Sequence, residues 1–174
     1  MPRKTQGLPG VALRGFGLVD LAVALAVLAI LLYFLLDRVL YMQEVAEKTE
    51  VEETVRSINY GLRLEAASRL ARGPDPGRLA LEKDNPVKWL NAPPRNYIGE
   101  HEKAPAHAKP GYWYYQLQSR QLIYRPNRAE RLKVEGLKEE VIRFEVRRSA
   151  GSNQVRLVPY QPYAWFDDRV EANR

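Results

Sequence analysis

Metal-ligating and nucleophilic residues are scarce in this 174-residue chain, which has no cysteine and two histidines. The lack of cysteine excludes disulfides, thiolate nucleophiles and zinc sites built from cysteine. His101 and His107 are six residues apart in a proline-rich segment, with Glu100 and Glu102 beside the first. A metal centre needs more ligands at helical or hairpin spacing. The pattern therefore favours two solvated loop histidines over a metal site.

A second group that could do chemistry is acidic. Its members could supply oxygen ligands to calcium, and they are Asp75, Glu82, Asp84, Asp167 and Asp168. They lack the spaced Asp/Asn/Gly pattern of a calcium loop, and the chain has no Walker loop, no Gly-x-Ser-x-Gly and no His-Glu-x-x-His motif. We therefore predict no catalytic residue, no metal and no cofactor, and a membrane-tethered enzyme is a disfavoured class.

Basic and aromatic residues are mixed between residues 112 and 148, as on surfaces that bind single-stranded nucleic acid. The set comprises Arg120, Arg125, Arg128, Arg131, Lys133, Arg147 and Arg148 with Tyr114, Tyr115 and Tyr124. Alternating arginines on the solvent face of a sheet give the same pattern. The whole chain has a net charge of +6, and three basic residues and no acid lie in the first fifteen residues, which leaves +3. This modest charge favours the interpretation that the basic residues keep the sheet surface soluble, with DNA binding as the alternative.

The charge with the most unusual setting is Asp20, which is the only charged residue between Phe16 and Leu36. This apolar run would form a helix about 30 Å long, which matches the hydrocarbon core of a bilayer. A signal peptide has a shorter apolar region followed by small residues, whereas this run ends in Asp37 and Arg38. The sequence therefore predicts a transmembrane helix over residues 16–36. A carboxylate in such a span costs about 2.5–3.5 kcal/mol, so Asp20 either has a partner or reaches back to water at the membrane boundary.

The residues on either side of this run differ in charge. Arg3, Lys4 and Arg14 precede it without any acid, whereas residues 37–53 carry six acidic residues, two of which are Asp37 and Glu44. The positive-inside rule then places the N-terminus in the cytoplasm and the rest of the chain across the membrane.

The N-terminus resembles that of type IV pilin-like proteins, the family of major and minor pilins and of type II secretion pseudopilins. It has a short basic leader ending in Gly15, then Phe16, and an acid, Asp20, at the fifth position counted from Phe16. The resemblance implies cleavage between Gly15 and Phe16 by a prepilin peptidase and N-methylation of Phe16. It implies that Asp20 serves assembly by pairing with the new ammonium of a neighbouring subunit, which offsets both charges and fixes the axial register. The implied partners are the peptidase, other pilin or pseudopilin subunits, the inner-membrane assembly platform and membrane lipid.

Several positions depart from the pattern of major pilins. Asp20 replaces the more usual Glu, Gly17 stands where Thr is common, and Asp37 stands where many major pilins have a helix-kinking Pro. The chain also lacks the cysteine pair that major pilins often have near the C-terminus. These departures favour a minor pilin or a pseudopilin.

The helix is expected to continue beyond the membrane to residue 72, because residues 37–72 contain no proline and are rich in helix-favouring residues. Gly73 and Pro74 then end it. Apolar residues recur every three or four positions and form one stripe, namely Val51, Val55, Ile58, Leu62, Ala66 and Leu70. On the solvent side we expect the i,i+4 pairs Glu44–Lys48, Glu52–Arg56 and Glu65–Arg69. A juxtamembrane coiled coil is the alternative use of the stripe.

The remaining chain changes from turns to strands. Residues 73–110 are proline-rich and read as irregular, with a short helix near Lys88 as an option and Trp89, Leu90, Tyr97 and Ile98 as anchors. Residues 112–117 and 121–125 predict a hairpin, and residues 141–147 and 155–158 predict two more strands. Residues 159–174 are expected at the edge of the sheet or in contacts. The predicted fold is α+β: a long N-terminal helix packed on a small antiparallel sheet.

Four segments follow from these interpretations: a leader over residues 1–15, a transmembrane helix over 16–36, its amphipathic extension over 37–72, and a periplasmic α+β domain over 73–174. Two hypotheses for function remain open. The first is a processed structural subunit of a type IV pilus or a type II secretion pseudopilus. The second is an unprocessed, signal-anchored inner-membrane protein with a periplasmic interaction domain.

Overall fold

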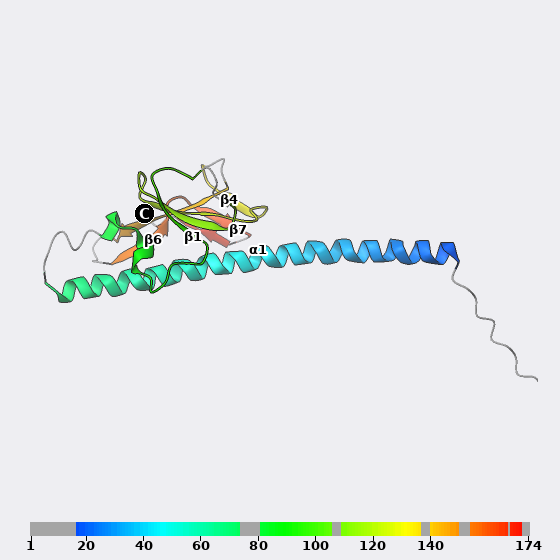
Figure 1. The fold of residues 1–174 in the computed structure, drawn as a ribbon, viewed down its shortest axis with the longest axis horizontal. Coiled ribbons are helices and arrows are strands. Elements are labelled where there is room, and N and C mark those ends of the chain that lie inside the picture. The colour runs from blue at the N-terminus through cyan, green and yellow to red at the C-terminus, as the bar shows by residue number, and fades with distance from the viewer. Residues whose placement is uncertain are drawn as a thin grey trace, which may run out of the picture. The chain divides into compact units, whose positions relative to one another are not determined.

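A single long helix opens the fold and is followed by two small sheets (Figure 1). The computed structural model describes residues 17–73, 81–105, 109–136, 140–149, 154–166 and 168–171. Helix α1 runs over Leu18–Ala71, so the predicted helix is confirmed from Leu18 onward. The chain divides after Tyr41 into two compact units, and the second contains the later turns of α1 with both sheets. The predicted α+β class is therefore confirmed.

The end of α1 has the local chemistry that the sequence predicts. Gly73 has φ +98°, a left-handed conformation that glycine adopts without a Cβ clash. Its amide nitrogen donates to the carbonyl oxygen of Leu70 at 3.2 Å and so satisfies one of the last free carbonyls of the helix. Earlier in α1, Gly61 allows close packing, because a Cβ at this position would clash with the carbonyl oxygen of Trp89.

The larger sheet has five strands in the order β1-β2-β3-β5-β6. These strands are β1 (Tyr97–His101), β2 (Tyr112–Gln116), β3 (Gln121–Arg125), β5 (Ile142–Arg148) and β6 (Val155–Pro159). The predicted hairpin and the two later strands are confirmed as β2–β3 and β5–β6. Strand β1 pairs with β2 in parallel, so the sheet is mixed and larger than the expected three or four strands. Strand β1 lies in the segment read as irregular; it is short, contains Gly99 and depends on β2 for its pairing.

The smaller sheet has three strands in the order β4-β7-β8. They are β4 (Leu132–Val134), β7 (Tyr163–Trp165) and β8 (Asp168–Val170). The C-terminal segment thus joins β4 in a second sheet and does not extend the edge of the larger one, and Tyr163 and Trp165 are buried. Before the first strand lie the 3-10 helices η2 (Leu81–Lys83) and η3 (Pro86–Trp89), which confirm a short helix near Lys88.

The core of the second unit lies between α1 and one face of the larger sheet, and it includes Leu132, Tyr163 and Trp165 of the smaller sheet. Val51, Ile58 and Leu62 of the predicted stripe are at most 1% exposed, and they belong to one cluster with alternate residues of the strands, such as Trp113 and Phe144. Burial of apolar area at about 25 cal/mol per Å² makes this contact the main stabilising term. The prediction for Leu70 is wrong: it is 52% exposed, because the packed stripe ends before the last turn of α1.

Helix α1 also satisfies the outer edge of β6. The side-chain nitrogen of Asn59 donates to the carbonyl oxygen of Leu157 at 3.3 Å, and the side-chain oxygen of Asn59 accepts from the backbone nitrogen of Leu157 at 2.8 Å. This pair of bonds takes the place of a further strand, because the unpaired groups of an edge strand otherwise invite pairing with another chain.

Candidate functional site

Of the site residues expected from the sequence, Asp20 is described, whereas Gly15 and Phe16 lie outside the described residues. Asp20 is in the first turn of α1, where its Oδ2 accepts a hydrogen bond from the backbone nitrogen of Gly17 at 3.1 Å. A carboxylate at a helix N-terminus is favoured by the free amides and by the helix dipole. The carboxylate therefore has a partner within its own chain.

The first turns of α1 are apolar on every side. All of the large apolar side chains between Leu18 and Leu36 are at least 50% exposed. The helix is long and apolar enough to cross a membrane, with a mean hydropathy of 2.7 over its most apolar window. None of this apolar window is buried by the residues that the structure describes.

Two buried carboxylates on α1, Glu44 and Glu47, are the strongest polar feature of the second unit. Glu44 is fully buried and accepts hydrogen bonds from the backbone nitrogen of Arg131 at 3.0 Å, from its guanidinium at 2.8 Å and from the indole Nε1 of Trp165 at 3.1 Å. Burial alone would raise the pKa of Glu44, but the hydrogen bonds from Arg131 and Trp165, together with the charge of Arg131, lower it below its usual value. Glu44 is thus held as an anion.

Glu47 lies one turn further along α1 and binds the segment that follows β3. Its Oε1 accepts from the hydroxyl of Tyr124 at 2.7 Å and from the backbone nitrogen of Asn127 at 2.6 Å, and its Oε2 accepts from the backbone nitrogen of Arg128 at 3.3 Å. Burial and the nearby Glu47 carboxylate both raise the pKa of Tyr124, so its hydroxyl remains a donor. We call Glu44 and Glu47 with these partners the carboxylate clasp, because together they hold residues 127–131 on α1.

The spacing of Glu44 and Glu47 in the sequence is a signal for the clasp. Glu44 and Glu47 continue the apolar stripe toward the N-terminus at the same spacing of three and four residues before Val51. The predicted solvent-side pair Glu44–Lys48 is therefore wrong, because Glu44 lies on the buried face. The pairs Glu52–Arg56 and Glu65–Arg69 are confirmed, with closest N–O distances of 4.0 and 2.7 Å.

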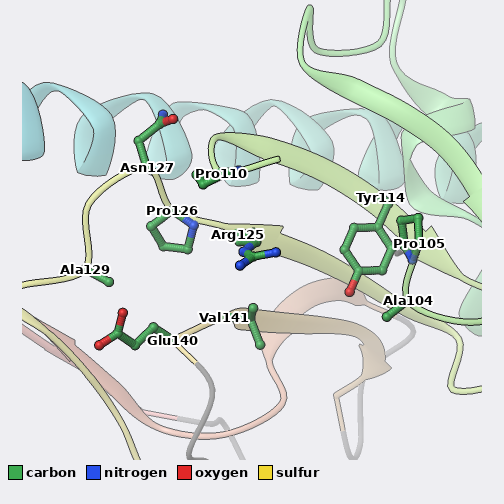
Figure 2. Close-up of a pocket in the computed structure, with 10 residues that line it drawn as sticks. All are labelled: Ala104, Pro105, Pro110, Tyr114, Arg125, Pro126, Asn127, Ala129, Glu140 and Val141. Carbon is green, nitrogen blue, oxygen red and sulfur yellow. The ribbon is translucent and has the colours of Figure 1, made fainter. Parts of the chain in front are cut away.

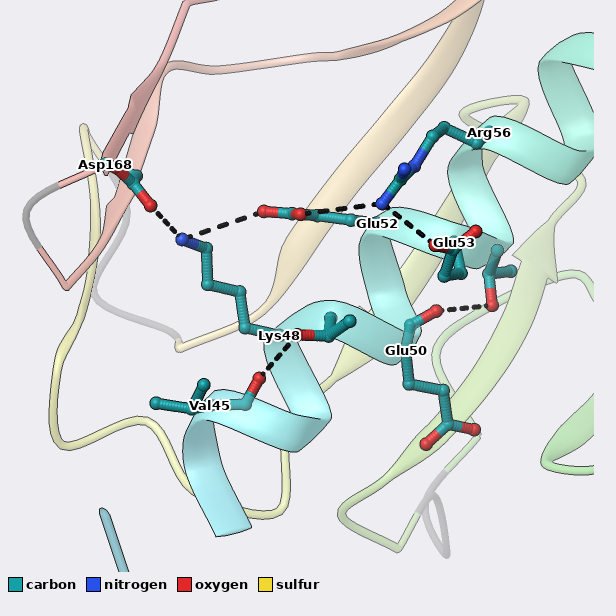
Figure 3. Close-up of polar contacts among 9 residues, drawn as sticks. Val45, Lys48, Glu50, Glu52, Glu53, Arg56 and Asp168 are labelled. Atoms are coloured by element: carbon teal, nitrogen blue, oxygen red, sulfur yellow. Dashed lines mark hydrogen bonds and ion pairs between the residues drawn. The ribbon is translucent and has the colours of Figure 1, made fainter. Parts of the chain in front are cut away.

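Lys48, which follows Glu47 in the sequence, joins α1 to β8 (Figure 3). Its Nζ bonds the carboxylate of Asp168 and lies 3.7 Å from the Oε1 of Glu52. Arg56 continues the network, with a guanidinium nitrogen 3.1 Å from the carboxylate of Glu53. The hydrogen bond to Asp168 raises the pKa of Lys48. Since most of these groups are well exposed, each pair contributes only about 0–1 kcal/mol.

The acids considered for calcium are not brought together where they are described. Glu82 bonds Arg148, Asp84 lies 3.4 Å from Arg69, and Asp168 bonds Lys48. Within the described residues no three His, Asp or Glu side chains are grouped so as to hold a metal ion. Asp75, Asp167 and His107 lie outside the described residues, and the Nε2 of His101 is 3.2 Å from the carbonyl oxygen of Ile98.

The basic and aromatic residues considered for nucleic acid also have other roles. The rings of Tyr114, Tyr115 and Tyr124 are at most 5% exposed, so their faces are not open to bases. Several of the basic residues bond acidic ones, in the pairs Arg128–Glu130, Arg131–Glu44, Arg147–Glu145 and Arg148–Glu82.

A pocket of about 430 Å³ lies beside β2 and β3 (Figure 2). Three prolines line it together with Tyr114, Arg125 and Glu140. Arg125 and Glu140 are its only charged lining residues among those described. The lining that the structure describes contains no serine, threonine, cysteine, lysine or histidine.

None of the protein-family models, curated proteins and solved structures with which the chain was compared matches it. The functional conclusion therefore rests on the residues and the geometry of the chain itself.

Proposed function

We propose that the chain is a pilin-like structural subunit, either a minor pilin or a pseudopilin. A prepilin peptidase cleaves it between Gly15 and Phe16, Phe16 becomes N-methylated, and the subunit joins a type IV pilus or a type II secretion pseudopilus through its N-terminal helix. Before assembly it is a single-pass inner-membrane protein with a cytoplasmic N-terminus and a periplasmic C-terminal domain. The other subunits and the inner-membrane assembly platform are its partners.

The observation that carries this proposal is the difference between the two ends of α1. One helix begins with apolar turns that are exposed on all sides and carry a single acid, Asp20, and it ends with a stripe that is buried on a sheet. A simple anchor needs no charge near its start, whereas a subunit that pairs with a neighbour's ammonium does. This combination supports assembly through the helix over anchoring alone.

The second candidate is an unprocessed, signal-anchored protein with a periplasmic interaction domain. The hydrogen bond from Gly17 to Asp20 favours it, because a carboxylate that is satisfied in its own chain does not require a neighbour. The two candidates differ in what happens between Gly15 and Phe16.

Replacing Gly15 with leucine is expected to block maturation when the chain is co-expressed with a prepilin peptidase. A bulky side chain next to the cleaved bond would obstruct its approach to the peptidase, so the full-length form should accumulate on gels and in mass spectra. Gly10→Leu in the same leader is the matched control and should be cleaved normally. The proposal would be contradicted if Gly15→Leu were cleaved as well as Gly10→Leu. It would also be contradicted if the parent chain and both variants all remained uncleaved.

A further inference from the structure

We infer that the inserted helix is matched in length to the bilayer, with Asp20 at one hydrocarbon boundary and Arg38 and Tyr41 among the lipid headgroups of the opposite leaflet. The inference rests on the membrane helix of the proposed function but is independent of cleavage and of assembly. It concerns residues 17–41 alone, which belong to one compact unit.

The later end of the span has the features of an interfacial anchor. The apolar run ends at Leu36, and the guanidinium carbon of Arg38 lies 5.2 Å from the centre of the Tyr41 ring. One turn before the end of the run, the rings of Tyr33 and Phe34 meet edge to face at 5.7 Å. Aromatic side chains gather at membrane–water interfaces, and arginine extends its charge toward headgroup phosphates while its stem stays in the apolar layer. These residues fit that boundary.

The start of the span has a different device. Asp20 has a short side chain, and its carboxylate is turned back toward the N-terminus, where it accepts from the backbone nitrogen of Gly17. In this direction lie the free amides of the first helical turn and, for a cytoplasmic N-terminus, the headgroups of the inner leaflet. A carboxylate at this boundary avoids most of the cost of burial in hydrocarbon.

The separation of the two ends decides whether both can reach a boundary at once. From Asp20 to Arg38 the helix rises about 27 Å, against about 30 Å for a hydrocarbon core. The small difference is within the reach of the arginine side chain. A shift of one helical turn, about 5.4 Å, toward the far leaflet would carry Asp20 into hydrocarbon.

Because of this match, the free-energy cost of the Asp20 charge arises only when the helix leaves the bilayer. In the inserted subunit the carboxylate lies at the boundary and needs no neighbour. When the helix leaves the bilayer toward the far side, the carboxylate enters an apolar environment and a partner ammonium becomes valuable. Asp20 would thus make extraction unfavourable unless a neighbouring subunit is in place to pair with it.

The lack of native cysteine allows a direct test by labelling single cysteines in the full chain. Val19→Cys, Val23→Cys, Leu32→Cys and Val39→Cys would be treated with a membrane-impermeant maleimide in membrane vesicles of both orientations. We expect Val19→Cys to react from the cytoplasmic side and Val39→Cys from the other side. Positions 23 and 32 should react at least about tenfold more slowly, because the hydrocarbon core excludes water and the reagent.

Protection of position 19 would place Asp20 inside the hydrocarbon and overturn the inference, as would protection of position 39. Fast labelling of positions 23 and 32 would overturn it as well, because the helix would then not span. N-terminal sequencing of the same samples reports cleavage separately, so failure of the length match and failure of processing are distinguishable. Adding Asp20→Asn to Val19→Cys is the matched control, and its rate should stay within about twofold if position 20 is already at the boundary.

Discussion

Replacement of Glu44 with alanine is expected to lower the free energy of unfolding by about 3–5 kcal/mol, which makes it the most destabilising single change that we predict in the second unit. The change removes the acceptor of three hydrogen bonds, leaves the indole nitrogen of Trp165 buried without a partner, and leaves Arg131 without its carboxylate. The side chain of Arg131 is 33% exposed, so water relieves part of the cost and the lower end of the range is expected.

Thermal unfolding of the full-length protein in detergent, followed by tryptophan fluorescence, would measure the effect. The three tryptophans all lie in the second unit, so they report on the domain that contains the clasp. We expect a decrease in Tm of roughly 10 °C. Glu50→Ala is the matched control, because Glu50 is an exposed glutamate on the same helix, and its Tm should stay near that of the parent chain. Equal shifts for the two variants would show that the clasp does not stabilise the domain.

The same residue predicts a pH dependence. The folded-state pKa of Glu44 is lowered, so its stabilising effect is fully present above the unfolded-state pKa of about 4.3 and is lost as the pH falls through the lower folded-state value. The stability difference between the parent chain and Glu44→Gln should therefore be largest near neutral pH and should shrink below about pH 4. A difference that stays constant down to pH 3 would contradict the assignment of Glu44 as a buried anion.

The second large effect is expected at Asp20. The Asp20→Ala variant should still be cleaved, because the change lies four residues after Phe16, but it should enter filaments poorly. Removing the carboxylate leaves the ammonium of a neighbouring subunit unpaired in an apolar environment, at a cost of about 2.5–3.5 kcal/mol, so incorporation should fall by at least about tenfold. The measurement is the fraction of subunit in sheared filaments or in cross-linked pseudopilus preparations.

Asp37→Ala provides the control for this prediction. Asp37 is the next acid along the helix and follows directly after the apolar run, so its removal deletes a charge without deleting the proposed pair. It should assemble at close to the parental level. Normal incorporation of Asp20→Ala would rule out the pairing role.

The sequence predicts the helix and most strands of the larger sheet better than it predicts how the strands pair. The proline-free, helix-favouring composition up to Gly73 predicts the length of α1, and helical spacing predicts the buried residues Val51, Ile58 and Leu62, because both are local properties of the sequence. Strands β2, β3, β5 and β6 were found from alternation and turn residues for the same reason. Strand β1 was missed because its parallel pairing with β2 depends on a non-local partner.

The site shows a similar limit. A glutamate on a helix is read as solvent-exposed unless its partners are known, and the partners of Glu44 lie 87 and 121 residues away in the chain. Only the register of the stripe could have placed Glu44 and Glu47 on the buried face. For Asp20 the sequence identified an unusual charge correctly, but the bond to Gly17 required the geometry of the first helical turn.

The most direct test of the central claim is the intact mass of the protein extracted from membranes, with its N-terminal sequence. The account predicts a chain that begins at Phe16 and carries one additional methyl group on its N-terminus. A chain that still begins at Met1 or Pro2 in the presence of a prepilin peptidase would contradict it. The protein would then be a signal-anchored membrane protein, and Asp20 would be a boundary charge without a role in assembly.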